Sequence, residues 1–392
     1  MLPKRILTII VFAQFCCTSL WFAGNGVLAQ LTEAFQLPIE VLGYLTSAVQ
    51  FGFILGTLIF ALLTIADRFS PSKVFFICAL FGATINLGML WGGNTLASLL
   101  TIRFMTGFFL AGIYPIGMKI AADYFEKGLG KSLGYLVGAL VVGTAFPHFV
   151  NTFSAEISWK WVIGSTSTVA SLGGLLLLLL VPNGPYRKAA SKLDFSILQQ
   201  IFKNKNFRGA AFGYFGHMWE LYAFWVFVPF ILEAYTTINY TTEINVPFWS
   251  FLIIGIGSLG CIAAGYFSES LGSKKVATIA LLVSGICCLV SPLFFTANSW
   301  IFLAFLLFWS SMIIADSPMF STLVAQNTSP TTKGTALTIV NCIGFALSII
   351  SIQLVSYLTT VLAPQYLFVV LGLGSVFGLI SLRLNINKSD TL

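Results

Sequence analysis

Charged side chains are scarce in this sequence, because Asp, Glu, Lys and Arg together make up only 8% of its 392 residues. Soluble domains carry about 25% charged residues, so the composition excludes an ordinary soluble globule. Hydrophobic residues reach 57% and aromatic residues 15%, whereas histidine occurs only twice. These proportions indicate an all-α integral membrane protein.

Signatures of several other protein classes are also missing. The sequence has no GxxxxGK[ST] loop for nucleotide phosphates, no HExxH or paired Cys/His spacing for a metal, and no nucleophile motif. All seven cysteines fall within apolar stretches and form no disulfide framework. We therefore expect no cofactor, no metal and no enzymatic activity.

Long apolar stretches occupy most of the chain. About 20 apolar residues are needed for a helix to cross the hydrocarbon core. The first stretch follows Lys4 and Arg5 like a signal peptide, but it is longer than a typical h-region and contains polar residues. We interpret it as the first of twelve transmembrane helices, predicted at residues 6–29, 40–63, 74–93, 97–121, 132–152, 159–181, 208–234, 248–268, 276–295, 300–325, 334–360 and 364–383.

The net charge of +7 is carried mainly by connectors on one side of the predicted membrane, the side of the N-terminus. Basic residues concentrate on the cytoplasmic side of membrane proteins, so the charge reports topology and does not indicate a nucleic-acid partner. We predict a multi-pass protein of the cell inner membrane with both termini cytoplasmic. Its expected partners are the lipid bilayer and a small molecule, and we expect a monomer.

The two halves of the chain resemble each other. The connector "ADRFSPSKV" (66–74) matches "GYFSESLGSKKV" (265–276), which places Asp67 against Glu269 with an offset of 202 residues. The starts of predicted helices five and eleven match with an offset of 204. We therefore predict two six-helix pseudo-repeats: an N-terminal bundle at 1–181, a cytoplasmic linker at 182–207, and a C-terminal bundle at 208–392.

These connectors and two helices resemble the major facilitator superfamily. The second connector carries the family's pattern of glycine, acid, glycine and paired bases at Gly265, Glu269, Gly272, Lys274 and Lys275. The first connector keeps Asp67, Arg68 and Lys73, but departs from the pattern at Leu63 and Ser70. Helix four is similar in Arg103, Gly107 and Ala111, and helix five in Gly134, Gly138 and Gly143.

The resemblance covers the whole chain and implies a rocker-switch transporter whose halves enclose a cavity near the membrane midplane. The two connectors would gate it, since an acid at a helix end beside basic residues makes contacts that form in one conformation and break in another. The alternative is that the connectors only set topology.

Ionisable residues at membrane depth are costly and mark functional paths, and helix seven carries two of them. His217 and Glu220 are spaced i, i+3 and share a helix face. A carboxylate away from water holds a proton more readily than an exposed one, so the pair is suited to proton coupling. The alternative is a static polar pair that holds helix seven to a neighbour.

Helices four and ten each combine a charge with a proline that bends the helix. Helix four has Arg103 and Lys119 around Pro115, and helix ten has Asp316 before Pro318. The basic pair hints at an anionic substrate, whereas Asp316, together with His217 and Glu220, hints equally at a proton or a cation. For Lys119 the alternative is a side chain that reaches the cytoplasm, and for Arg103 it is a structural contact.

Helix one shows a polar face, and several aromatic and amide side chains extend the candidate path. The face consists of Gln14, Thr18, Trp21 and Asn25 at helical spacing. The repeat alignment matches Trp21 with Tyr222, so helices one and seven are predicted to present related faces. The remaining candidates for the substrate or proton pathway are Trp225, Tyr114 and Asn341.

Together these features predict a secondary active transporter of a small molecule that works by alternating access and is suited to proton coupling. The rivals are a transporter-like membrane sensor without net flux and a lipid flippase. The sequence leaves the substrate and the direction of transport open.

Overall fold

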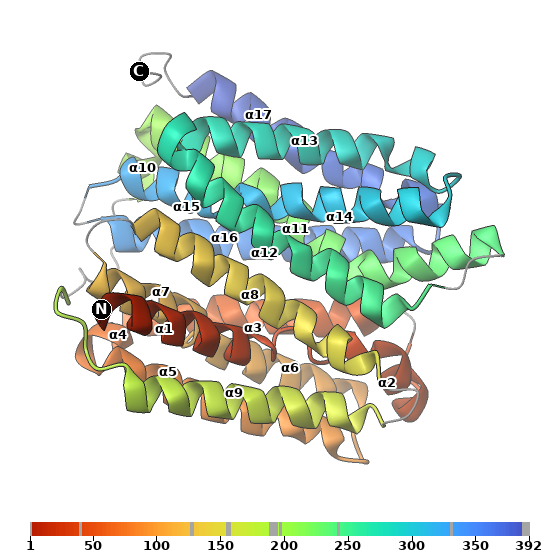
Figure 1. Ribbon diagram of the computed structural model, residues 1–392, viewed down its shortest axis with the longest axis horizontal. Helices are drawn as coiled ribbons and strands as arrows, with labels where there is room; N and C mark the ends of the chain where they lie inside the picture. Colours follow the sequence, from red (N-terminus) through yellow and green to blue (C-terminus); the bar gives the residue numbers. More distant parts are fainter. Residues whose placement is uncertain are drawn as a thin grey trace.

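The structure is a computed structural model that describes residues 2–38, 41–125, 129–153, 158–187, 195, 198–240, 244–329 and 332–385. All regular secondary structure in these residues is helical. Figure 1 shows two groups of long helices that run across the same slab, one coloured red to yellow-green and the other green to blue.

The first group comes from the N-terminal part of the chain. It consists of α1 (Leu2–Thr18), η1 (Asn25–Val27), α2 (Leu28–Phe35), α3 (Val41–Leu62), α4 (Ile65–Arg68), α5 (Pro71–Leu87), η2 (Gly88–Leu90), α6 (Leu96–Leu110), α7 (Tyr114–Tyr124), α8 (Leu129–Asn151) and α9 (Lys160–Leu180).

The second group comes from the C-terminal part of the chain, and its first helix lies within the predicted linker at 182–207. It consists of α10 (Leu198–Lys203), α11 (Lys205–Asn239), α12 (Val246–Leu271), α13 (Ser273–Phe294), α14 (Ser299–Ala315), α15 (Ser317–Gln326), α16 (Lys333–Leu358), η4 (Pro364–Leu371) and α17 (Gly372–Asn385). The two groups meet along two seams, where α8 packs against α12 and α3 packs against α16.

Eleven helical stretches in the described residues are long and apolar enough to cross a membrane. The predicted first span differs from them, because its apolar helix covers only Arg5–Thr18. The chain turns at residues 19–24 and then continues as η1 and α2. The predicted continuous helix at 6–29 is therefore wrong, and the count of twelve and the symmetry of the halves stay predictions.

The spans that carry Pro115 and Pro318 break where the sequence predicted bends. α6 ends at Leu110 and α7 begins at Tyr114, with Pro115 in its first turn. α14 ends at Ala315 and α15 begins at Ser317, with Pro318 in its first turn. Proline fits this position because a first-turn N–H has no intrahelical partner.

The N-terminus, α4 and the end of α17 lie at the same edge of the slab, on the left of Figure 1. We call this edge the linker end, and the opposite edge the far end. Asp67 in α4 and Glu269 in the last turn of α12 both lie at the linker end, as predicted. The C-terminal residues after Asn385 lie outside the described part of the chain.

Close helix crossings hold the first group together. α3 crosses α6 where Gly52 faces the backbone of Phe104 and Gly107 faces the backbone of Val49. A Cβ atom at either glycine would overlap that backbone, so only glycine permits this approach. The crossing fixes α6, and with it Arg103, against the helices of the first group.

Candidate functional site

A cavity of about 630 Å³ lies between the two groups of helices. Its walls come from α3, α4, α7 and α8 on one side and from α11, α15 and α16 on the other. It opens at the linker end, because the lining residues Gln326 and Lys333 there are exposed. Cavities of about 300–1,000 Å³ accommodate small molecules, so this volume suits a small organic ligand.

The cavity wall is mixed in polarity. Among the predicted pathway residues, it includes Tyr114, Lys119 and Asn341. The Tyr214 hydroxyl, also in the wall, donates a hydrogen bond of 2.7 Å to Asn341 Oδ1 and so fixes the amide of α16 against α11. Among the described residues that line it, Asp67, Lys119 and Lys333 are the charged ones.

Lys119 is held by acidic neighbours. Its Nζ lies 3.0 Å from Asp67 Oδ1 and 3.9 Å from Asp123 Oδ1, one turn further along α7. The Arg187 guanidinium donates to the backbone carbonyl of Asp67 at 2.8 Å and so ties the start of the linker to α4. The predicted gating residue Asp67 therefore contacts α7 and does not pair with the basic residues of its own connector.

The other members of the two connectors make few contacts. Arg68 Nε donates to Thr64 Oγ1 at 3.2 Å. Gly272 ends α12 with φ +81°, a conformation that favours glycine. The remaining members lie in or beside helices at the linker end: Lys73 in α5, Gly265 and Glu269 in α12, and Lys274 and Lys275 in α13.

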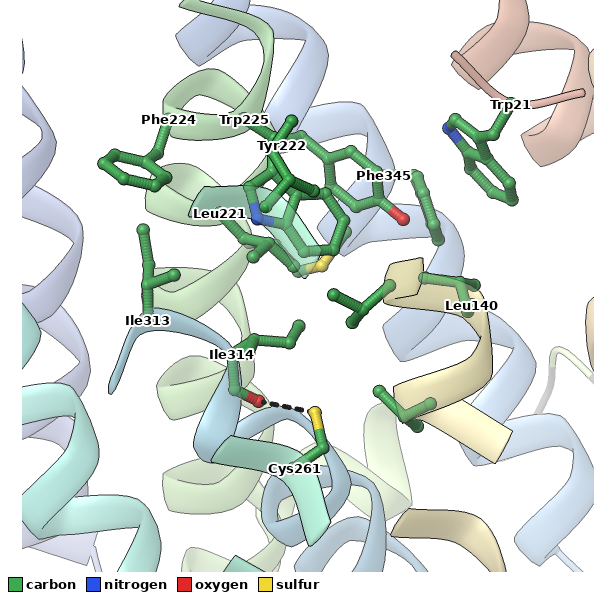
Figure 2. Packing of buried hydrophobic residues seen from close by; sticks show 14 of the residues in the cluster. Trp21, Leu140, Leu221, Tyr222, Phe224, Trp225, Cys261, Ile313, Ile314 and Phe345 are labelled. Atoms are coloured by element: carbon green, nitrogen blue, oxygen red, sulfur yellow. Dashed lines mark hydrogen bonds between the residues drawn. The ribbon is translucent and has the colours of Figure 1, made fainter. Parts of the chain in front are cut away.

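Aromatic side chains from both groups pack together between the cavity and the far end, one helical turn beyond the lining residues Thr57 and Asn341. We call Trp21, Phe22, Phe53, Tyr222, Trp225 and Phe345 the aromatic layer; all six are buried. Trp21 stacks on Tyr222 with ring centroids 5.9 Å apart, and Phe53 lies 4.6 Å from Phe345. Figure 2 shows Tyr222 and Phe345 between Trp225 and Trp21.

Beyond the aromatic layer both seams are shut toward the far end. On one seam, Ser348 Oγ donates to Gln50 Oε1 at 3.0 Å, and Gln353 Nε2 donates to Ser47 Oγ at 2.8 Å. On the other, the rings of Phe149 and Phe251 lie 5.0 Å apart. The cavity is therefore accessible from the linker end and closed from the far end.

The α8–α12 seam is also in contact near the linker end. The hydroxyls of Tyr135 and Tyr266 lie 3.1 Å apart, and Lys131 Nζ lies 4.0 Å from the centre of the Tyr266 ring. Of the described side chains of α8 only Leu133 lines the cavity, and no described residue of α12 does. The opening consequently lies on the side of α3 and α16.

His217 pairs with Asp316, and the predicted pairing of His217 with Glu220 is wrong. His217 Nδ1 lies 2.7 Å from Asp316 Oδ1, and both side chains are 1% exposed. Glu220, three residues after His217, shares its helix face, but the break between α14 and α15 places Asp316 closer to the imidazole. Asp316 Oδ2 and His217 Nε2 have no hydrogen-bond partner among the described residues.

The pair lies behind the cavity wall. Ser317, which follows Asp316, lines the cavity, and so does Tyr214, whose ring lies 5.9 Å from the imidazole of His217. On the other side, the imidazole lies 6.3 Å from the ring of Phe320. A proton that reaches the pair from the cavity therefore has to pass one layer of side chains.

Glu220 is surrounded by donors from three other helices. Its Oε1 accepts from Trp309 Nε1 at 3.0 Å and from Cys288 Sγ at 3.3 Å. Its Oε2 accepts from Ser284 Oγ at 3.0 Å and from Ser375 Oγ at 2.8 Å. The carboxylate thus joins α11 to α13, α14 and α17, inside the second group and away from the cavity wall.

Arg103 is fully buried and faces the turn that interrupts the first span. Its Nη1 donates to the Leu20 carbonyl at 3.0 Å, and its Nη2 donates to the Trp21 carbonyl. These carbonyls lie just beyond the end of α1, where helical hydrogen bonding stops. No carboxylate in the described residues forms an ion pair with Arg103, so its visible role is to bind the backbone beneath Trp21.

Replacing Arg103 by Met is expected to lower the free energy of unfolding, because two buried carbonyls lose their donor at about 1–3 kcal/mol each. The free energy of unfolding of Arg103→Lys should lie between those of the wild-type protein and Arg103→Met, because a single ammonium group replaces a planar group that reaches both carbonyl oxygens. Thermal unfolding in detergent measures the effect, with the exposed Lys205→Met as control. Equal melting temperatures for Arg103→Met and Lys205→Met would contradict this role.

The remaining predicted residues lie outside the cavity wall. Gln14 faces Gly117 of α7, and the amide nitrogen of Asn25 donates to Thr46 Oγ1 at 2.7 Å. Trp21, Tyr222 and Trp225 belong to the aromatic layer, where the match of Trp21 with Tyr222 corresponds to a direct contact. The predicted polar face of helix one is divided by the turn after Thr18.

The sequence does not single out Tyr214, Phe53, Phe345 or the four donors around Glu220. Tyr214 lies one turn before His217, and that spacing was a usable signal. Phe53 and Phe345 are two of 38 phenylalanines, and nothing in their local sequence separates them from lipid-facing ones. The donors come from three separate helices, so only the packed bundle identifies them.

A helical membrane bundle with a cavity between two groups of helices, open at one end and shut at the other, defines a membrane transporter architecture. Residues 10–351 match the sequence profile of the Major Facilitator Superfamily. The chain therefore belongs to the Major Facilitator Superfamily.

Solved structures share this fold at low sequence identity. The proton:xylose symporter XylE superposes with a TM-score of 0.75 at 15% identity, over 96% of this chain and 94% of XylE. The nucleoside transporter NupG superposes with a TM-score of 0.72 at 15% identity, over 98% of this chain and all of NupG (100%). These likenesses establish the fold and leave the substrate open.

Curated relatives match over part of the chain. Efflux pump FUBT of Fusarium oxysporum is 26% identical over 194 residues, which are 47% of this chain and 32% of that protein. The putative metabolite transport protein YaaU of Escherichia coli is 24% identical over 155 residues, 39% of this chain and 33% of YaaU. The matched regions cover only about a third of each relative, so the activities in their names are not transferred to this chain.

Proposed function

We propose that the protein is a secondary active transporter that moves a small molecule by alternating access. The observation that carries the proposal is a cavity of about 630 Å³ between the two groups of helices, open at the linker end and closed by the aromatic layer. A cavity with access from one end is one of the two states that alternating access requires. The relatives named as an efflux pump and a metabolite transport protein support the same class.

The linker end is the cytoplasmic end in this proposal. Lys119, Arg187, Lys274, Lys275 and Lys333 all lie there, and basic residues concentrate on the cytoplasmic side. The cavity then opens to the cytoplasm, and the protein resides in the inner membrane. Lys119 and Asp67 neutralise each other at the mouth, so a substrate meets mainly hydroxyl, amide and apolar groups inside.

The transport is coupled to protons through His217 and Asp316 in this proposal. A carboxylate and an imidazole within 2.7 Å, both buried, exchange a proton readily, and each keeps one polar atom without a partner. The groups that face them are Tyr214 and Glu220 on α11, Cys261 on α12 and Phe320 on α15. None of these is basic, so the pair has no fixed positive neighbour to keep Asp316 charged.

Glu220 serves as a structural anchor in this proposal, although the sequence favoured it for the proton path. Its oxygens accept from four donors on three helices, so hydrogen bonds fix the carboxyl group in place. Releasing and recovering a proton would require these hydrogen bonds to rearrange. The same donors make it a strong tie between α11 and the rest of the second group.

The transporter proposal is tested in proteoliposomes that contain the purified protein. A thermal-shift screen against a metabolite library first identifies a ligand. The ligand, loaded inside the vesicles, should then drive counterflow of the same labelled compound from outside. Protein-free vesicles are the control. A ligand that stabilises the protein but gives no counterflow would overturn the proposal in favour of a membrane sensor without net flux.

A further inference from the structure

A second hollow lies on the membrane-facing surface, away from the central cavity. It is a groove of about 550 Å³ between α3, α6 and α16. The lining residues of the groove and those of the cavity form separate sets. All three helices belong to stretches apolar enough to cross a membrane, so the groove opens into the hydrocarbon of the bilayer.

The groove has the depth of one membrane leaflet. It begins at Tyr44, in the first turn of α3 at the far end, and reaches Phe51. Helical rise of 1.5 Å per residue places Phe51 about 15 Å from the start of α3, which is half of the roughly 30 Å hydrocarbon core. The lining from α6 and α16 lies equally close to the far end of those helices.

The walls are mostly apolar, with several aromatic rings, and include a hydrogen-bonded polar pair. Phe51 is 57% exposed and Tyr44 is 42% exposed, so both rings stand out beside the groove. Phe104 of α6 lies 5.8 Å from Phe51. The polar pair is Gln353 and Ser47, whose hydrogen bond crosses the seam between the two groups of helices. The groove is thus continuous with the α3–α16 seam, and an occupant touches both groups.

We propose that this groove binds the acyl chain of a bilayer lipid and that the bound chain favours the conformation in which the far end of the α3–α16 seam is closed. A flexible hydrocarbon chain fits an apolar groove that runs from the membrane interface to the midplane. Because the chain contacts α3, α6 and α16 together, opening the seam removes part of its binding surface. A ligand that binds one state better shifts the equilibrium toward it. Only the effect on the conformation rests on the proposed alternating access; the binding of the chain does not.

Photo-crosslinking tests the binding site without any transport substrate. The protein is reconstituted with phosphatidylethanolamine that carries a diazirine in its acyl chain, irradiated, digested and mapped by mass spectrometry. Labelling at Phe51 and Phe104 should exceed labelling at Leu172 and Leu179, which are exposed on α9, several-fold. Equal labelling at these four positions would mean ordinary boundary lipid and would overturn the proposal.

Groove-filling variants sharpen the test. Ala48→Trp fills the groove from α3, and Ile349→Trp fills it from α16 if the first variant folds poorly. Either should reduce labelling at Phe104 to the level at Leu172. The matched control Thr168→Trp, on the exposed face of α9, should leave labelling at Phe104 unchanged. Undiminished labelling at Phe104 in both folded groove variants would contradict the site.

The conformational clause is tested by cysteine accessibility. Ser348 is buried in the closed seam, so Ser348→Cys should react with a membrane-permeable maleimide only when the seam opens. Adding phosphatidylethanolamine to the detergent-purified protein should slow modification at position 348 several-fold, and Ala48→Trp should abolish that dependence. A modification rate that does not depend on lipid would overturn the proposed effect on the conformation. The binding site itself would still be decided by the crosslinking experiment.

Discussion

Replacing Asp316 by Asn is expected to abolish transport driven by a proton gradient while exchange of substrate for substrate continues. The amide keeps the shape of the side chain and a hydrogen bond to His217, but it cannot take up a proton. Driven accumulation should fall to the level set by substrate equilibration. Exchange, which needs no net proton movement, should persist. Both fluxes are measured in proteoliposomes with the ligand from the thermal-shift screen.

Glu220→Gln is the matched control, because it removes a second buried carboxylate one turn from the pair. The model of a structural anchor predicts a lower melting temperature, since an amide nitrogen cannot accept from the donors that surround Glu220. Driven transport per folded molecule should remain. If driven transport and exchange fall together in a well-folded Asp316→Asn protein, or if only Glu220→Gln uncouples them, the proton site is assigned wrongly.

A disulfide across the far end of the α8–α12 seam is expected to stop transport completely and reversibly. Gly255 on α12 faces Ala145 on α8, and a Cβ at Gly255 would lie 3.8 Å from the Cβ of Ala145. Disulfides span about 3.5–4.5 Å between Cβ atoms, so Ala145→Cys/Gly255→Cys should bridge without distortion. The bridge holds the two groups in the conformation described here, and the opposite opening cannot form.

Oxidation should therefore reduce both counterflow and driven transport to background, and a reductant should restore them. The single variants Ala145→Cys and Gly255→Cys should remain active. A bridge between the first group and the start of the linker, Ser70→Cys/Asn183→Cys, joins positions whose side chains are hydrogen-bonded at 2.8 Å at the linker end and should leave transport unchanged. Full transport by the bridged double variant would show that this seam does not open.

Hydropathy was sufficient to place most of the helices, because a membrane span has to be apolar over its whole length. It failed in the first span, where an apolar composition continues through the turn at residues 19–24. That turn depends on Arg103, which is 83 residues from Leu20 in the sequence and binds its carbonyl. A local pattern carries no information about a donor supplied by another helix.

The ionisable residues were found from the sequence, but their partners were not. Burial of these residues is predictable because a charged side chain inside an apolar span avoids lipid and faces the protein interior. Helical spacing then favoured a pairing of His217 with Glu220, because spacing along the sequence relates only residues of the same helix. Pairing His217 with Asp316 requires the packing of α11 against the break before α15, and the two residues are 99 positions apart.

The sequence by itself determined the membrane class, the positions of most spans, the bends at Pro115 and Pro318, and the burial of Arg103, His217, Glu220 and Asp316. Each of these follows from the composition or from neighbours within a few turns. Only the tertiary structure decided which charges meet, which aromatic rings close the cavity, and which end is open. These depend on contacts between helices that lie far apart in the chain, where small differences in packing select one partner over another.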